Sequence, residues 1–196
     1  MPREQRGNTF MNSDHAVRND ISLALIHLTG KRGVLSARDA LLSILREGRI
    51  KGSGKSGYVK GSKTATCFTE MPLSSVLSFV KASTNSSHPY ECYGIALSKE
   101  SGWNRGARPV IYLPDIEGNW IPEDQKWRHV RFEFGTVDFS HEREWRSEGN
   151  FSLDGIGFYV IVPDKEQEDS VREQIHETAD SHILGFLHIN ILSQFL

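Results

Sequence analysis

The 196 residues include only two cysteines, Cys67 and Cys92. Two are too few for a disulfide framework, and each lies in an apolar stretch, where free buried cysteine is common. The sequence also lacks the run of roughly 18 apolar residues that a membrane span needs, and its N-terminal segment lacks the apolar core of a signal peptide. These absences predict a cytoplasmic protein with no membrane partner.

An excess of either charge is missing as well. The chain has 23 Lys and Arg against 25 Asp and Glu, for a net charge of −2, so the whole molecule has no electrostatic bias towards nucleic acid. Its hydrophobic content of 38% and charged content of 24% are ordinary for a globular protein. We predict a flexible polar arm over residues 1–20 and a single domain, built around one core, over residues 21–196.

Apolar periodicity predicts helices mainly in the N-terminal half and strands mainly in the second. The clearest helix covers Ser36–Gly48, because Ser36 can cap it, its apolar residues share one face and Gly48 can end it. Without regular alternation of strands and helices, the fold class is α+β with small mixed or antiparallel sheets. We also expect helices over residues 73–83 and 165–180, and strands within residues 21–30, 64–72, 90–98, 108–114, 129–137, 142–147, 155–163 and 182–192.

One local charge bias lies between Lys31 and Lys63, with nine Lys or Arg and only two acids, Asp39 and Glu47. The segment is either a solvated face or an anion-binding rim for nucleic acid or nucleotide phosphates. It contains Gly54-Lys55-Ser56, which is like the end of a P-loop, but Arg49 replaces the required first glycine and the segment follows a helix. No metal is expected either, because three histidines recur every six residues, a spacing that does not gather ligands.

Acidic and basic residues interleave in the segment HEREWR. As a strand, this segment would place Glu142, Glu144 and Arg146 on one face, and Arg143 and Trp145 on the other. A glutamate near arginines could accept a hydrogen bond from a sugar hydroxyl or orient a nucleophile. The alternative is charge pairing between strands around a half-buried Trp145.

The order of these segments resembles the AbiGi-type family of abortive infection proteins, which act in phage resistance. The resemblance covers roughly residues 25–147, in the segments IHLTG, ILREG, CFTEMPLSSV, CYGIALSKE, GARPVIYL and EREWR. The sequence departs from the family pattern at Leu28, where an aromatic residue is usual, and at Thr69-Glu70, where Cys-Asp is common. The matching positions are His27, Thr29, Ile44, Leu45, Gly48, Cys67, Phe68, Pro72, Leu73, Tyr93, Gly94, Ile95, Leu97, Ser98, Lys99, Pro109, Val110 and Tyr112.

A more distant resemblance is to DarT-like ADP-ribosyltransferases, which share a His-x-Thr strand, an Ile-Leu-x-x-Gly helix end, a mobile loop and a late strand with glutamate. It implies an ADP-ribosyltransferase-like fold with NAD as co-substrate. By this resemblance, His27 and Thr29 would contact the nicotinamide-side ribose of NAD. The pyrophosphate would face the basic loop residues Arg49, Lys51 and Lys55.

The same resemblance implies Glu144 as the catalytic glutamate, with Glu142 also eligible. The glutamate would stabilise an oxocarbenium-like transition state at the ribose C1′ or activate a nucleic-acid or protein acceptor. This hypothesis requires His27 and Glu144 to face one cleft. The alternative is that His27 is a hydrogen-bonded core histidine, which would not face a cleft. Two other hypotheses stay open: a non-catalytic antitoxin or regulator that acts with a partner protein of a defence system, and a nucleic-acid-binding module that uses residues 31–63.

Overall fold

The computed structural model describes residues 20–31, 33–55, 58–83, 90–175, 182–192 and 194. The predicted N-terminal arm lies outside these ranges except for Asp20, and so do residues 176–180 of the helix predicted over residues 165–180. The observed helix ends at Arg172, earlier than predicted. Within the described ranges, no helix is both long enough and apolar enough to cross a membrane.

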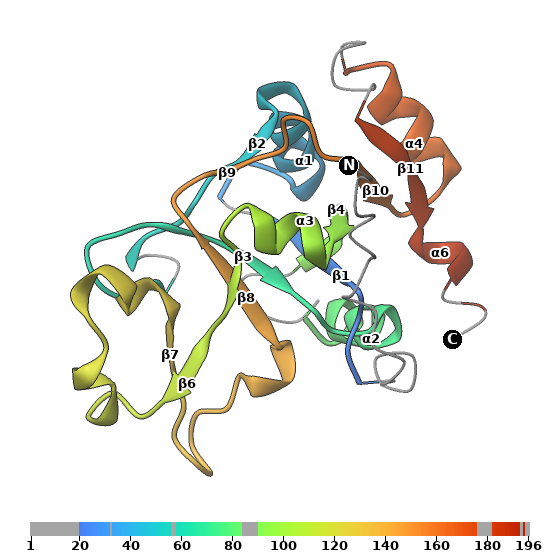
Figure 1. Cartoon of the computed structure of the whole chain (residues 1–196). Helices are drawn as coiled ribbons and strands as arrows, with labels where there is room; N and C mark the ends of the chain where they lie inside the picture. Colours follow the sequence, from blue (N-terminus) through green and yellow to red (C-terminus); the bar gives the residue numbers. More distant parts are fainter. Residues whose placement is uncertain are drawn as a thin grey trace, which may run out of the picture.

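A seven-stranded sheet forms the centre of the fold (Figure 1). Its order is β11-β10-β4-β1-β3-β8-β5, and neighbouring strands are antiparallel except β10 and β11. The predicted α+β class with mixed pairing is confirmed, although this sheet is larger than we expected. The strands are β1 (Ala24–Gly30), β3 (Ala65–Thr69), β4 (Tyr90–Ser98), β5 (Arg108–Pro109), β8 (Glu144–Glu148), β10 (Phe158–Val162) and β11 (Ile183–His188).

The first helix, α1 (Ala37–Glu47), forms where the sequence predicts it. The Ser36 side chain accepts a hydrogen bond from a backbone N–H of the first turn, and Gly48 ends the helix in the left-handed conformation with φ of 61°. Leu41 and Leu45 are among the residues that α1 buries against the sheet.

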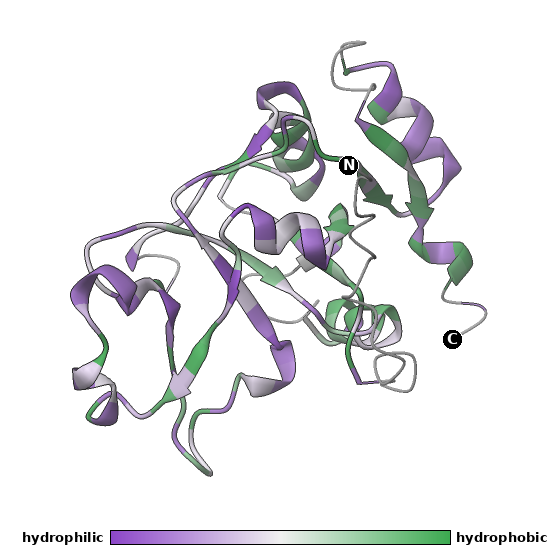
Figure 2. Cartoon of the chain, in the orientation of Figure 1, coloured by the Kyte–Doolittle hydropathy of each residue, from purple (hydrophilic) through white to green (hydrophobic). Residues whose placement is uncertain are grey.

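Helices cover both faces of the main sheet, and hydrophobic residues follow the inner strands and α2 (Figure 2). We call the two sides the α1 face and the α2 face. The sheet residues on the α1 face include Leu25, Phe68, Ile95, Trp145 and Val160, and those on the α2 face include Ile26, Ala96 and Ile161. The other helices are α2 (Leu73–Ser83), α3 (Lys99–Asn104), α4 (Lys165–Arg172) and α6 (Ile189–Leu192).

A small cap stands beside β3 and β8 (Figure 1). It contains a parallel strand pair and two 3-10 helices, and its Trp127 packs with Val59 and Ala65 in a separate apolar cluster. Arg146 of β8 donates a hydrogen bond to the Trp127 carbonyl, which fixes the cap to the α2 face. The cap elements are β6 (Ile111–Leu113), η3 (Glu117–Trp120), η4 (Glu123–Arg128) and β7 (His129–Arg131).

Several predicted elements are wrong in detail. The predicted strand over residues 108–114 is split between β5 and β6, which belong to different sheets. The strand predicted over residues 129–137 ends at Arg131, because Glu133 and Val137 close a tight turn around Gly135, whose φ is 79°. This turn leaves Phe134 94% exposed. A pair of short strands, β2 (Arg49–Ile50) and β9 (Phe151–Ser152), and helix α3 were not predicted.

Candidate functional site

The main sheet separates the two residues that the predicted NAD cleft requires. His27 packs edge-on against Phe68, with 6.0 Å between the ring centroids, and Phe68 pairs with Trp145 across β3 and β8. These three side chains lie on the α1 face. Glu144 precedes Trp145 in β8 and pairs with Thr69, so its side chain lies on the α2 face. The predicted cleft between His27 and Glu144 is therefore wrong.

His27 and Thr29 are both bound to backbone groups of the fold. His27 lies in the middle of β1 rather than at its end, and its Nδ1 is 2.8 Å from the carbonyl oxygen of Cys67. Thr29 is only 4% exposed. Its hydroxyl lies 2.8 Å from the carbonyl oxygen of Ala37 and 3.1 Å from that of Tyr93, so Thr29 links α1 to the sheet. This burial leaves almost no surface of Thr29 for the ribose contact that the resemblance implies.

The basic segment between residues 31 and 63 does not form one surface. Arg38 and Arg46 of α1 donate hydrogen bonds to α4 and to the residues that follow it. Arg49 and Lys51 both pair with Glu47, at 3.3 and 2.6 Å. Of the three basic residues predicted to face the NAD pyrophosphate, Lys55 lines the cavity described below, and Arg49 and Lys51 do not line it.

Glu144 and Arg146 form a buried ion pair within β8. Arg146 Nε is 2.8 Å from Glu144 Oε1 and Arg146 Nη2 is 3.1 Å from Glu144 Oε2, with side-chain exposures of 3% for Arg146 and 12% for Glu144. The remaining guanidinium nitrogen donates to the Trp127 carbonyl at 2.8 Å. Cys67 lies opposite Arg146 on β3, and burial, followed by the charge of Glu144, raises the pKa of its thiol. The sequence left open an alternative in which charges pair between strands. Charge pairing is present, but it joins two residues of the same strand, β8.

Glu142 lies before this strand rather than on it. It ends the 3-10 turn η5 (Ser140–Glu142), and Arg143 then takes the left-handed conformation with φ of 47°. The predicted shared strand face for Glu142 and Glu144 is wrong, yet the turn leaves the two carboxyl groups close enough to interact. Burial, followed by the charge of Glu144, raises the pKa of Glu142 to about 7. A carboxyl group that titrates near neutral pH can both give and take a proton.

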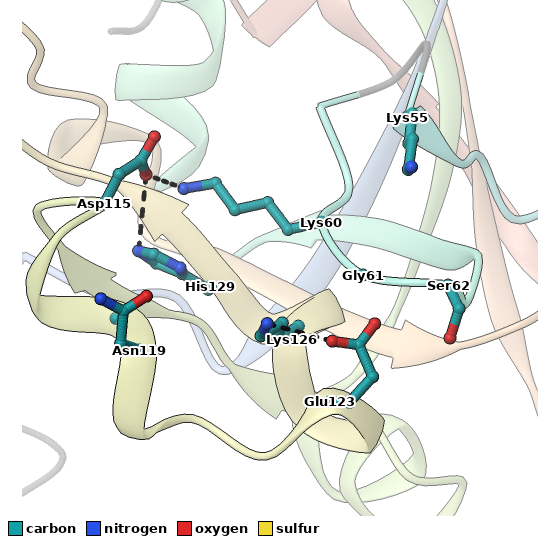
Figure 3. A pocket seen from close by; sticks show the side chains of 10 residues that line it. Lys55, Lys60, Gly61, Ser62, Asp115, Asn119, Glu123, Lys126 and His129 are labelled. Atoms are coloured by element: carbon teal, nitrogen blue, oxygen red, sulfur yellow. Dashed lines mark hydrogen bonds and ion pairs between the residues drawn. The ribbon is translucent and has the colours of Figure 1, made fainter.

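A second candidate site lies between the cap and the loop before β3 (Figure 3). This cavity, here called the lysine cavity, has a volume of about 420 Å³, which is in the range of small-molecule sites. One wall comes from the end of the basic segment and the other from η3, η4 and the start of β7. The lining residues are Lys55, Lys60, Gly61, Ser62, Asp115, Gly118, Asn119, Glu123, Lys126 and His129.

The charges of the lysine cavity are only partly balanced. Lys60 forms an ion pair with Asp115, and Lys126 pairs with Glu123 at 3.0 Å (Figure 3). Lys55 forms no ion pair with any carboxylate in the described part of the chain. The three lysines therefore outnumber the two acids around the hollow.

Two exposed aromatic side chains belong to the segments that line this cavity. Tyr58 lies between Lys55 and Lys60 in the chain and is 86% exposed, with φ of 61°. Trp120 follows Asn119 and is 67% exposed. A non-glycine residue in the left-handed region is uncommon, and such strain clusters at functional sites. Proteins that bind single-stranded nucleic acids combine cations, which bind the phosphates, with aromatic side chains, on which the bases stack.

Sequence reasoning missed most of this cavity, because its walls are segments more than fifty residues apart in the chain. The one usable signal was the basic segment, which contributes Lys55 and Lys60. Comparisons with models of known protein families, with curated proteins and with solved structures find no match for this chain.

Proposed function

We propose that this chain is a component of a phage-defence system and that it binds single-stranded nucleic acid in the lysine cavity. The observation that carries the proposal is the placement of Lys55, Lys60 and Lys126 around one hollow. The exposed residues Tyr58 and Trp120 belong to the same two chain segments, although neither lines the hollow itself. Cations bind the phosphates of a single strand and aromatic faces stack on its bases. The order of the AbiGi-type segments supports the defence role.

The charge arrangement also indicates what kind of binding to expect. A phosphate that enters the cavity competes with Asp115 for Lys60 and with Glu123 for Lys126, whereas Lys55 binds it without competition from a described carboxylate. Binding should therefore be moderate and should weaken steeply as salt rises. Only the end of the basic segment takes part, because five of its other members are bound elsewhere in the fold, namely Arg38, Arg46, Arg49, Lys51 and Lys63.

The test is fluorescence anisotropy with a labelled single strand of about 12 nucleotides, a length within the known site sizes of single-strand binders. We expect Lys55→Gln to reduce the slope of log K against log salt by about 0.7, the value for one phosphate contact. Trp120→Ala should weaken binding about fivefold or more through lost stacking. Lys165→Gln is the matched control, since Lys165 is 63% exposed and pairs with acids on α4. The proposal fails if the strand does not bind, or if neither cavity variant changes binding.

A second candidate function rests on Glu142. Its neutral-range pKa beside Glu144 would suit acid or base catalysis of glycosidic bond cleavage, as in ADP-ribosyl transfer from NAD, on the α2 face and without His27. The test is nicotinamide release from NAD by wild type and by Glu142→Gln, with DNA, RNA and lysate protein as acceptors. Release that the substitution abolishes supports this function. A folded protein that releases no nicotinamide excludes it and leaves a non-catalytic binding or regulatory role.

A further inference from the structure

A second group of cations lies next to the lysine cavity, at the edge of the main sheet. Arg108 is on the edge strand β5, and Arg128 is the last residue of η4. Arg128 Nε and Nη2 lie 3.3 and 3.1 Å from the carbonyl oxygen of Pro109. Arg108 Nη1 lies 2.8 and 2.7 Å from the carbonyl oxygens of Trp103 and Ala107. The two guanidinium groups are therefore anchored around the same short strand.

Neither arginine has a carboxylate partner among the residues that the structure describes. Burial, followed by the nearby charge of Arg108, lowers the pKa of Arg128, so the two groups are close enough to repel each other. Two cations that are fixed by carbonyl oxygens and lack a counter-charge attract an anion. The fork of each guanidinium suits phosphate oxygens in particular.

Trp103 adds an aromatic surface to this pair. The Arg108 guanidinium carbon lies 3.7 Å from the centre of the Trp103 ring, and Trp103 is 49% exposed. Its ring also packs edge-on against Trp145, with 6.4 Å between centroids, which holds it in place. An arginine stacked on a fixed indole offers a base both a flat surface and a cation.

We infer that Arg108, Arg128 and Trp103 form a second contact for the same single strand, which passes from the lysine cavity over η4 to the edge strand β5. Helix η4 joins the two places, because Lys126 lines the cavity and Arg128, two residues later, belongs to the arginine pair. This inference rests on the proposed function. It adds that the ligand is a strand long enough to reach both contacts rather than a mononucleotide.

The experiment compares the single strand with adenosine monophosphate as ligands of the wild type and of the double variant Arg108→Gln/Arg128→Gln. For the strand, we expect the slope of log K against log salt to fall by about 1.4, the value for two phosphate contacts. Binding of adenosine monophosphate in the lysine cavity should not change. Trp103→Ala should weaken strand binding about fivefold or more. The matched control is Arg38→Gln/Arg46→Gln, which removes two α1 arginines that also donate to uncharged groups.

The outcomes separate this inference from the proposed function. If the arginine variant keeps the wild-type salt slope while Lys55→Gln lowers it, the inference is overturned and the lysine cavity stands. If the α1 control lowers the slope equally, net charge alone explains the loss and the inference is again overturned. If no strand binds, both fall. Arg108→Lys/Arg128→Lys should restore the slope, because it keeps both charges, and this rescue excludes misfolding as the cause.

Discussion

Glu142 should make the free energy of unfolding depend on pH around neutrality. Its pKa is raised from 4.5 to about 7 in the folded chain, first by burial and then by the charge of Glu144. A raised carboxyl pKa means that the folded state holds its proton more tightly than the unfolded state. Well below pH 4.5 both states are protonated and the shift has no effect on stability. As pH rises towards 7 the unfolded state releases its proton first, so stability falls.

The size of the pKa shift sets how much free energy of unfolding is lost at high pH. A shift from 4.5 to about 7 corresponds to about 3 kcal/mol once pH exceeds both values. Because part of the carboxyl group remains in contact with water, we expect about 2 kcal/mol. Glu142→Gln keeps the shape and is neutral at every pH. The excess in free energy of unfolding of the variant over wild type should therefore grow with pH, from about 1 kcal/mol or less near pH 5 to about 2 kcal/mol near pH 8.

The assay is urea unfolding of wild type and Glu142→Gln between about pH 5 and pH 8, with the difference between the two plotted against pH. Subtracting the variant removes the contribution of the titrating groups that do not interact with Glu142. Glu133→Gln serves as the control, because Arg131 lowers the pKa of this partly exposed carboxyl and removal of its charge should give no gain at high pH. A difference for Glu142→Gln that stays flat across this range would refute the reasoning.

Three further predictions concern the buried ion pair of β8, the C-terminal end of α1 and the Cys67 thiol. Arg146→Met should lower the free energy of unfolding by about 3 to 5 kcal/mol, because it leaves the buried charge of Glu144 unpaired, and adding Glu144→Gln should recover part of the loss in the same urea assay. A single variant as stable as wild type would contradict this pairing. Gly48→Ala should lower the free energy of unfolding by about 1 kcal/mol in thermal unfolding, since Gly48 ends α1 with a positive φ. No loss would show that the C-terminal end of α1 can relax. The Cys67 thiol is partly exposed, but its pKa is raised by desolvation, so it should react with iodoacetamide much more slowly in the native protein than after unfolding; rapid labelling of Cys67 in the native protein, read by mass spectrometry, would contradict this.

The helices and most inner strands were predictable because their signals are local. Ser36 and Gly48 mark the two ends of α1 within the segment itself, and the apolar runs around Leu25 and Val160 are long enough to require burial. Phe134 shows where this reasoning fails. It lies in the strand predicted over residues 129–137, yet the turn at Gly135 interrupts pairing and leaves the ring in solvent.

The faces of the predicted site were not predictable in the same way. The prediction assumed that the two-residue alternation of a strand continues from Glu144 back to Glu142. Arg143 adopts a left-handed conformation, however, so the strand begins only at Glu144. Whether His27 and Glu144 share a face depends on the order β1-β3-β8 and on the register of both pairings. Strands that are distant in sequence set that order, and no pattern within β1 or β8 encodes it.

Charge pairing, rather than charge density along the chain, decides which cations can bind a ligand. Arg49 and Lys51 lie in the most basic segment, yet both are paired with Glu47, and an anion would have to displace that carboxylate. Arg108 and Arg128 lie outside the segment, but carbonyl oxygens hold them while their charges stay unmatched within the described chain. An anion gains more from a cation that lacks a counter-charge than from one that it must first separate from a carboxylate. The arginine pair should therefore contribute more to strand binding than Arg49 and Lys51 do, although a count of basic residues ranks them in the opposite order.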